Sequence, residues 1–287
     1  MQRIIAAPLL AAALAIALTG CSTLKLAYNN LPEVAYWWLN SYFDFESNQT
    51  ARVRNELDRL LAWHRREELP RWIALLQKAQ ALAPADSTPA QACEFGEAIR
   101  VRLLAIAEHV EPQAAELALT LTPAQLEQLQ KKYARLNADY RSDWLDKSRE
   151  AQQKKRYEQW VDRSEDFYGK LDDAQKSAMR QMIAESAFSS ALFDAERKRR
   201  QAVLLSTLRT ASAGGTSAVE TQRALHAYVL TVAEAPPGRW REQQQVLWQE
   251  GCRNFARLHN MASPTQREHA AKRLQAYEGE LKDLLEQ

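Results

Sequence analysis

The sequence predicts an all-α protein, an elongated multi-helix bundle with one or two very long helices. Prolines stand mostly between segments whose apolar residues recur every three or four positions. No stretch alternates apolar and polar residues for long enough to predict a sheet. Four segments also open with a capping tetrapeptide that ends in Gln, in which two side chains bond free backbone N–H groups of the first turn. These tetrapeptides begin at Thr88, Thr122, Asp172 and Ser263.

Segment 48–66 shows the helical pattern plainly. Val53, Leu57, Leu60, Leu61 and His64 recur on one face, and charged residues occupy the other. The same reasoning gives the expected helices in chain order, which are 32–43, 48–66, 70–82, 89–111, 123–168, 173–212, 217–235, 239–260 and 264–287.

Segment 123–168 is the longest of these. As one continuous helix it would be about 69 Å long. The best internal break is 210–216, which contains Gly214 and Gly215. We therefore expect an N-terminal helical region, 31–212, and C-terminal helices, 213–287, that pack on the same bundle.

The first twenty residues have the features of a secretion signal. Arg3 gives a positive start, and 4–18 carry no charge over a length too short to span a membrane. The run ends in Leu18-Thr19-Gly20-Cys21, which resembles the bacterial lipobox. The resemblance implies a signal peptide over 1–20, a diacylglycerol and palmitate-type lipid anchor on Cys21, and a lipidated tether over 21–30. The alternative is an ordinary cleaved signal with a coincidental cysteine.

Residue Ser22, which follows the candidate lipidated cysteine, bears on the location. By the enterobacterial sorting rule, Ser in place of Asp at this position favours the outer membrane. The expected location is therefore the periplasmic face of the outer membrane. If the organism sorts lipoproteins differently, the inner membrane remains open.

Removal of the signal leaves Cys93 and Cys252 as the interior cysteines. In an oxidising compartment two thiols more naturally form a disulfide than a metal or redox site. They are the candidate disulfide. The alternative is two buried free thiols that never meet.

Composition excludes several function classes. The 38 basic and 36 acidic side chains nearly cancel, which argues against nucleic acid as a partner. Only 8 residues are Gly, and neither a Gly-rich phosphate loop nor G-x-G-x-x-G is present. The motifs H-E-x-x-H and G-x-S-x-G are also missing. We therefore expect no catalytic, cofactor-binding or metal site.

One capping tetrapeptide carries a local resemblance. Leu121-Thr122-Pro123-Ala124-Gln125 resembles the L-T-x-x-Q motif of the Spy-type periplasmic chaperones, small helical proteins that cradle unfolded clients on a concave surface. Leu171-Asp172-Asp173-Ala174-Gln175 is a degenerate second copy. The resemblance covers about ten residues and implies an unfolded client as a partner. The same tetrapeptide is a competent cap in any helix.

A second resemblance covers the whole chain. The sequence resembles a family of uncharacterised proteobacterial lipoproteins, which implies a location and a helical fold but no mechanism. The residues that carry it are Cys21, Tyr28-Asn29-Asn30, Trp37-Trp38-Leu39, Tyr42-Phe43-Asp44, Trp63-His64-Arg65-Arg66 and Leu69-Pro70.

Two compositional clusters have alternative interpretations. Seven aromatic residues lie within 28–45, where they could meet a membrane interface or fill the bundle core, and the core is the favoured interpretation. The basic runs 154–156 and 197–200 could bind lipid phosphates, but nearby acidic residues favour ordinary solvated helix faces.

The expected function is non-catalytic binding of an envelope protein or an unfolded client in a groove between long helices. The alternative is an enzyme with a carboxylate–histidine site around Asp44, His64 and Glu68, because His64 and Glu68 lie one helical turn apart. In the simpler interpretation His64 is a core-edge histidine bonded to one of these carboxylates. A third possibility is a purely architectural tether.

Overall fold

The computed structural model describes residues 20–287, with side chains from residue 24 onward. Residues 1–19 of the expected signal peptide and the side chain of Cys21 therefore lie outside the described part. Within it, every regular element is helical. The elements are α2 (Gly20–Asn29), α3 (Leu31–Phe43), α4 (Ser47–Trp63), η1 (His64–Glu68), α5 (Leu69–Leu82), α6 (Pro89–Ala118), α7 (Pro123–Tyr140), η2 (Arg141–Leu145), α8 (Arg149–Tyr168), α9 (Asp173–Ala184), α10 (Ser190–Ser212), α11 (Ala218–Ala233), α12 (Arg239–Asn260) and α13 (Pro264–Leu285).

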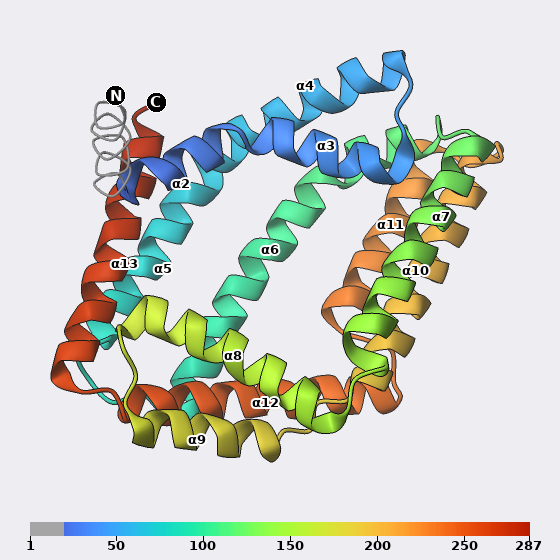
Figure 1. The fold of residues 1–287 in the computed structure, drawn as a ribbon. Coiled ribbons are helices and arrows are strands. Elements are labelled where there is room, and N and C mark those ends of the chain that lie inside the picture. The colour runs from blue at the N-terminus through green and yellow to red at the C-terminus, as the bar shows by residue number, and fades with distance from the viewer. Residues whose placement is uncertain (1–19) are drawn as a thin grey trace, which may run out of the picture.

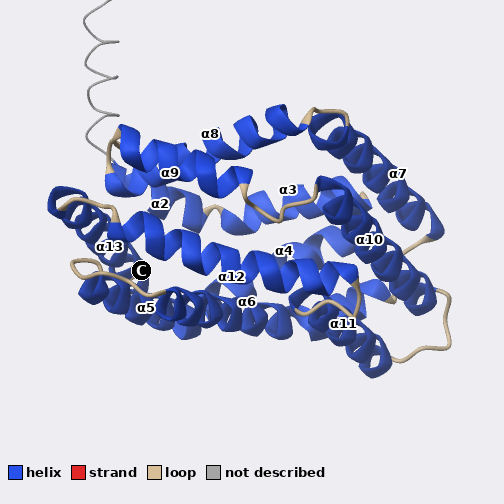
Figure 2. Cartoon of the chain, turned by 90° about the horizontal axis from the view of Figure 1, so that it is seen from below, coloured by secondary structure: helices blue, strands red, loops and turns tan. Residues whose placement is uncertain are grey.

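The helices form a four-sided bundle (Figure 1). Helices α3 and α4 lie along one side, α7, α10 and α11 along the next, α8, α9 and α12 along the third, and α5 and α13 along the fourth. Helix α6 crosses from the α12 side to α11 and contacts both. Seen from below, α6 shares a layer with α5 and α11, and α8 lies in the opposite layer (Figure 2).

The C-terminal helices belong to this same bundle. Helices α11 and α12 pack on α6, and α13 packs on α5, α8 and α2. The chain after Gly214 and Gly215 therefore returns to cover helices from its first half.

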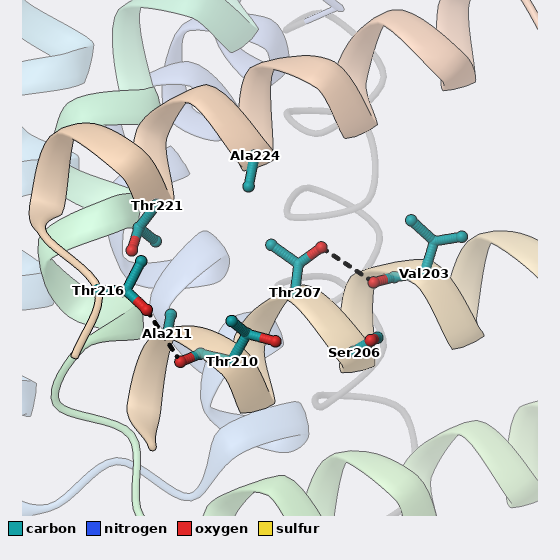
Figure 3. Close-up of a pocket in the computed structure, with 8 residues that line it drawn as sticks. All are labelled: Val203, Ser206, Thr207, Thr210, Ala211, Thr216, Thr221 and Ala224. Atoms are coloured by element: carbon teal, nitrogen blue, oxygen red, sulfur yellow. Dashed lines mark hydrogen bonds between the residues drawn. The ribbon is translucent and has the colours of Figure 1, made fainter. Parts of the chain in front are cut away.

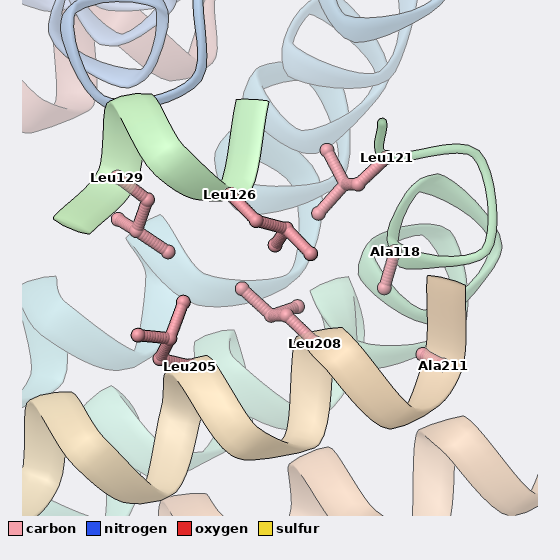
Figure 4. Packing of buried hydrophobic residues seen from close by; sticks show 7 residues of the cluster. All are labelled: Ala118, Leu121, Leu126, Leu129, Leu205, Leu208 and Ala211. Carbon is pink, nitrogen blue, oxygen red and sulfur yellow. The ribbon is translucent and has the colours of Figure 1, made fainter. Parts of the chain in front are cut away.

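One core cluster joins α7 to α10 (Figure 4). Leu126 and Leu129 of α7 face Leu205 and Leu208 of α10, and each pair is spaced by three residues. This spacing puts both members of a pair on one helix face. Leu129 is only 1% exposed, so the centre of the contact is buried.

The expected single helix over 123–168 is wrong. Helix α7 passes into the π-turn η2, and α8 starts only at Arg149. The break is stabilised locally, because Ser148 Oγ accepts from the N–H of Ala151 at 3.2 Å and Gln152 Nε2 donates to the carbonyl of Trp144 at 2.8 Å. The longest helix of the described chain is instead α6, with 30 residues and a length of about 45 Å.

The expected helix over 173–212 is also two helices. Helix α9 ends at Ala184 and α10 begins at Ser190. The loop between them is bonded by α12, where a carboxylate oxygen of Glu250 accepts from the N–H of Ala187 at 2.9 Å. This tertiary contact leaves no mark in the local sequence pattern.

Two helix ends expected shortly before prolines, at 66 and at 111, are not found. Pro70 follows the π-turn η1, so that α4, η1 and α5 run on without a loop. Pro112 lies inside α6, which continues to Ala118 because its last turns are buried, with Ala115 at 0% and Ala118 at 1% exposure. Packing of this face offsets the hydrogen bond that proline cannot donate.

The segment 21–30, expected as a tether, is almost entirely helix α2. Its Tyr28 is buried in a cluster with Leu69 of α5 and Leu284 of α13. Lys25 forms an ion pair with Asp283 of α13. The chain is therefore packed against the bundle from Lys25 onward.

Candidate functional site

The first candidate site is an apolar cavity of about 540 Å³ between α4 and α6. Its walls are apolar side chains, including Leu57 and Leu60 of α4 and Val110, Ala114 and Leu117 of α6. These five are only partly buried, so the cavity opens as a groove along the two helices. Helices α3, α10 and α11 close its floor through Leu39, Phe43, Leu204, Leu208 and Leu225.

Charged and aromatic groups border this groove. Arg52 of α4 forms an ion pair with Glu116 of α6. Trp63 of α4 stacks on His109 of α6 with ring centroids 3.8 Å apart. Burial lowers the pKa of His109, and the charge of Arg66 lowers it further. An apolar floor with a polar border is the usual anatomy of a protein-binding groove.

A second apolar cavity, of about 520 Å³, lies between α5, α6, α8 and α12. A disulfide joins Cys93 of α6 to Cys252 of α12, with the two Cα atoms 5.2 Å apart, and Cys252 lines this cavity. Gly96 permits the close approach of the two helices, because a Cβ at this position would lie 2.7 Å from the ring of Trp248.

The histidine beside the second cavity has both ring nitrogens occupied. His259 Nδ1 lies 2.9 Å from the hydroxyl of Tyr168, and Nε2 lies 2.9 Å from the carbonyl of Ala85. Burial raises the pKa of Tyr168 to about 12, so its hydroxyl stays protonated. Neither ring nitrogen of His259 is therefore free to bind a ligand.

A smaller cavity of about 300 Å³ lies between α10 and α11 and carries several hydroxyl side chains (Figure 3). Thr207 donates to the carbonyl of Val203 at 3.0 Å, and Thr216 donates to that of Thr210 at 3.2 Å. Both hydroxyls are thus committed to the backbone.

The capping glutamines meet in pairs next to the larger cavities. Gln125 Nε2 donates to Gln49 Oε1 at 2.6 Å, and Gln49 Nε2 donates back to Gln125 Oε1 at 3.2 Å. Each amide oxygen also accepts the N–H of its own cap residue, Thr122 or Glu46. This pair joins the start of α4 to the start of α7, beside Leu121, which lines the first cavity.

The second pair repeats this arrangement at another corner. Gln175 Nε2 donates to Gln266 Oε1 at 2.7 Å, and Gln266 Nε2 donates back at 3.0 Å. Their oxygens accept the N–H groups of Asp172 and Ser263. The starts of α9 and α13 are joined in this way. Sequence analysis found three of the four caps but missed Gln49, because its cap residue is Glu46.

The structure does not assemble the candidate polar cluster of Asp44, His64 and Glu68. Asp44 follows α3 with φ +50°, and the 17 residues of α4, about 26 Å of helix, separate it from His64. His64 Nδ1 pairs with the hydroxyl of Tyr28 at 2.9 Å rather than with a carboxylate. Burial lowers the pKa of His64, and the charge of Glu68 opposes this shift.

Glu68 itself is a buried ion-pair partner. Its side chain is 0% exposed, and Oε1 accepts from Arg71 at 2.5 Å and from Arg102 at 3.4 Å. These bonds tie η1 to α5 and α6. The expected cluster is therefore wrong. Glu68 links η1 to two helices, and Asp44 lies at the C-terminal end of α3.

The aromatic residues of 28–45 divide between the two interpretations. Tyr28, Tyr36 and Phe45 are buried, as the core interpretation expects. Trp37 and Trp38 are each 60% exposed, so for them that interpretation is wrong. The alternation arises because α3 packs on α4 and α7 with one side only.

Of the two basic runs, 197–200 is neutralised by its own helix. Glu196 accepts from Arg199 and Arg200, at 2.7 and 2.6 Å, and Asp194 accepts from Lys198 at 2.6 Å.

In the part of the chain that the structure describes, no group of three or more His, Cys, Asp or Glu could hold a metal ion. None of the described helices is long and apolar enough to cross a bilayer.

A family model described as a family of unknown function (DUF6279) matches residues 41–223, more than half of the chain. The chain belongs to this family. The span matched by DUF6279 contains α4 and α6, which wall the first cavity. Comparison with curated proteins found no match, and comparison with solved structures found none either.

Proposed function

We propose that this DUF6279 chain is a lipid-anchored, non-catalytic lipoprotein of the periplasmic face of the outer membrane. It binds an apolar segment of another polypeptide, an envelope protein or an unfolded client, in the groove between α4 and α6. The observation that carries the proposal is the first cavity, about 540 Å³ of apolar space open along two helices.

The size and lining of the groove favour an apolar side-chain ligand. Leu57 and Leu60 of α4, one helical turn apart, and Leu117 of α6 offer aliphatic surface, which suits an amphipathic helix or an extended apolar stretch. The bordering residues Arg52 and Glu116 pair with each other, so they give the groove a polar border without a net charge.

The anchor is tested through Cys21. If Cys21 carries the acyl chains, Cys21→Ser in the full chain abolishes metabolic labelling with palmitate and blocks lipid-dependent maturation. Membrane fractionation should find the wild type in the outer membrane. Equal palmitate labelling of the variant would contradict the anchor.

The groove is tested by filling it. Ala114→Trp places a large side chain in the first cavity, whereas Ala92→Trp on the same helix lines the second cavity and is the matched control. In a chain starting at Gly20, which contains every described helix, Ala114→Trp should raise by about tenfold the concentration that suppresses aggregation of a reduced, unfolded model protein. Ala92→Trp should leave it unchanged.

Both variants must keep the helical circular dichroism and cooperative unfolding of the parent. A folded Ala114→Trp chain with unaltered client binding and unaltered crosslinking to envelope proteins would overturn the groove as the binding site. Loss of binding in both variants would assign binding elsewhere.

A further inference from the structure

Helices α2 and α3 carry a concentrated apolar surface. Among the described residues, 16 large apolar side chains are exposed, and five of these fall within 26–38. Their exposed fractions run from 46% to 66%. We name this surface the aromatic patch, and it consists of Leu26, Leu31, Val34, Trp37 and Trp38.

Four residues of the patch form a continuous stripe on α3, and Leu26 lies on α2. Leu31, Val34 and Trp38 follow the i, i+3, i+7 spacing of one helix face, and Trp37 borders it. The opposite side of α3 holds the buried Tyr36 and packs on α4 and α7. The stripe is therefore the side of α3 that the bundle leaves uncovered.

Two exposed tryptophans side by side are unusual on a free surface, because each exposes a large apolar ring to water. Indole rings combine an apolar body with an N–H donor, which matches the boundary between lipid chains and headgroups. Trp37 Nε1 already donates to Glu33 at 2.6 Å, so this ring is held in place rather than free to fold inward.

The position of the patch along the chain selects its occupant. Cys21 lies in the first turn of α2, and only Asn30 separates α2 from α3 (Figure 1). The sixteen residues that follow Cys21, up to Trp37, span about 24 Å at the helical rise. An acyl group on Cys21 would thus hold the stripe beside the bilayer. From this geometry we propose that the aromatic patch inserts into the lipid interface of the membrane that carries the anchor.

This inference rests on the proposed anchoring and adds an orientation to it. With the patch in the interface, α3 lies against the membrane and the groove of the neighbouring α4 is held at a fixed height above it. A single acyl attachment without the patch would leave the bundle free to rotate.

The charges around the patch define what kind of lipid it takes. Arg54 pairs with Glu33, and Lys25 pairs with Asp283, so these two basic groups near the stripe are neutralised. Insertion is therefore driven by apolar burial and does not depend on anionic lipid or low salt.

The test uses the chain from Gly20 with Cys21→Ser, which lacks any acyl group. It should float with phosphatidylcholine vesicles. Adding phosphatidylglycerol to the vesicles, or about 0.5 M salt to the buffer to screen charges, should change the bound fraction little. Trp37→Ser combined with Trp38→Ser should weaken the vesicle partition coefficient by at least about tenfold. Brominated lipid should quench the tryptophan fluorescence of the parent more than that of this variant.

The matched control is Leu103→Ser combined with Val219→Ser, which removes exposed apolar side chains at 56% and 55% exposure elsewhere on the bundle. The control should bind vesicles as the parent does. Absence of vesicle binding by the unacylated parent, equal binding by the tryptophan variant, or binding only to anionic lipid would overturn the proposal. If the parent forms a dimer and does not bind vesicles, and the tryptophan variant is monomeric, the patch would instead be the contact surface for a second copy of the chain.

The experiments distinguish a failure of the patch proposal from a failure of the anchor or of the groove proposal. The tryptophan variant should retain client binding in vesicle-free solution, so loss of vesicle binding with normal client binding concerns the patch alone. Vesicle binding by the patch, combined with no palmitate labelling of the wild-type full chain, would instead reject the anchor and keep the patch.

Discussion

Replacement of Cys93 by Ser is expected to lower the free energy of unfolding of the oxidised chain by about 4 to 5 kcal/mol. The disulfide with Cys252 joins residues separated by 159 positions. A closure of this length removes much conformational entropy from the unfolded chain, which is the source of the expected effect. It also fastens α6 to α12 across the second cavity.

Urea unfolding followed by circular dichroism measures this effect. The parent should lose the same stability when dithiothreitol is added, and Cys93→Ser should then show no further response to the reductant. Cys252→Ser is the matched control and should behave as Cys93→Ser does. A parent whose unfolding midpoint ignores the reductant would contradict the prediction.

Replacement of Gln125 by Ala is expected to lower the free energy of unfolding by about 2 to 3 kcal/mol. The change removes the amide that accepts the N–H of Thr122 and leaves the buried Gln49 without its reciprocal partner. Loss of a cap costs about 1 kcal/mol, and loss of the bonds that the Gln125 amide makes to Gln49 and to the carbonyl of Asp44 adds about 1 to 2 kcal/mol. Gln175→Ala should act in the same way on Gln266.

The chain offers an internal control for this prediction. Gln91 accepts the N–H of Thr88 in the same kind of capping box but is exposed, so Gln91→Ala should cost about 1 kcal/mol or less. A double-mutant cycle between Gln49→Ala and Gln125→Ala should give a coupling of about 1 kcal/mol or more. Equal losses for Gln91→Ala and Gln125→Ala, with no coupling, would show that only the cap matters.

The all-α class and most helix starts follow from local physics. The Thr122 and Asp172 caps act within four residues, so the sequence predicts them and the structure contains them. Helix ends are harder to predict from the sequence. Pro112 predicts an end that burial of Ala115 and Ala118 overrides, and the break before Ser190 depends on Glu250, sixty residues away.

The candidate site was the least predictable part. Helical spacing places His64 near Glu68, but whether Asp44 joins them depends on how α3 and α4 connect, which no local pattern encodes. The groove depends on five helices meeting around one space. The exposed stripe of Trp37 and Trp38 was visible as an aromatic cluster, but burial of neighbours such as Tyr36 could be assigned only with the packing of α3 in hand.

The paired glutamines make the contacts at two corners of the bundle insensitive to pH and to salt. An amide neither gains nor loses a proton across the ordinary pH range, and it carries no net charge for dissolved ions to screen. The amide–amide bonds between Gln49 and Gln125 and between Gln175 and Gln266 should thus hold equally at low pH and at high salt concentration. An ion pair such as that of Arg52 with Glu116 weakens under the same conditions.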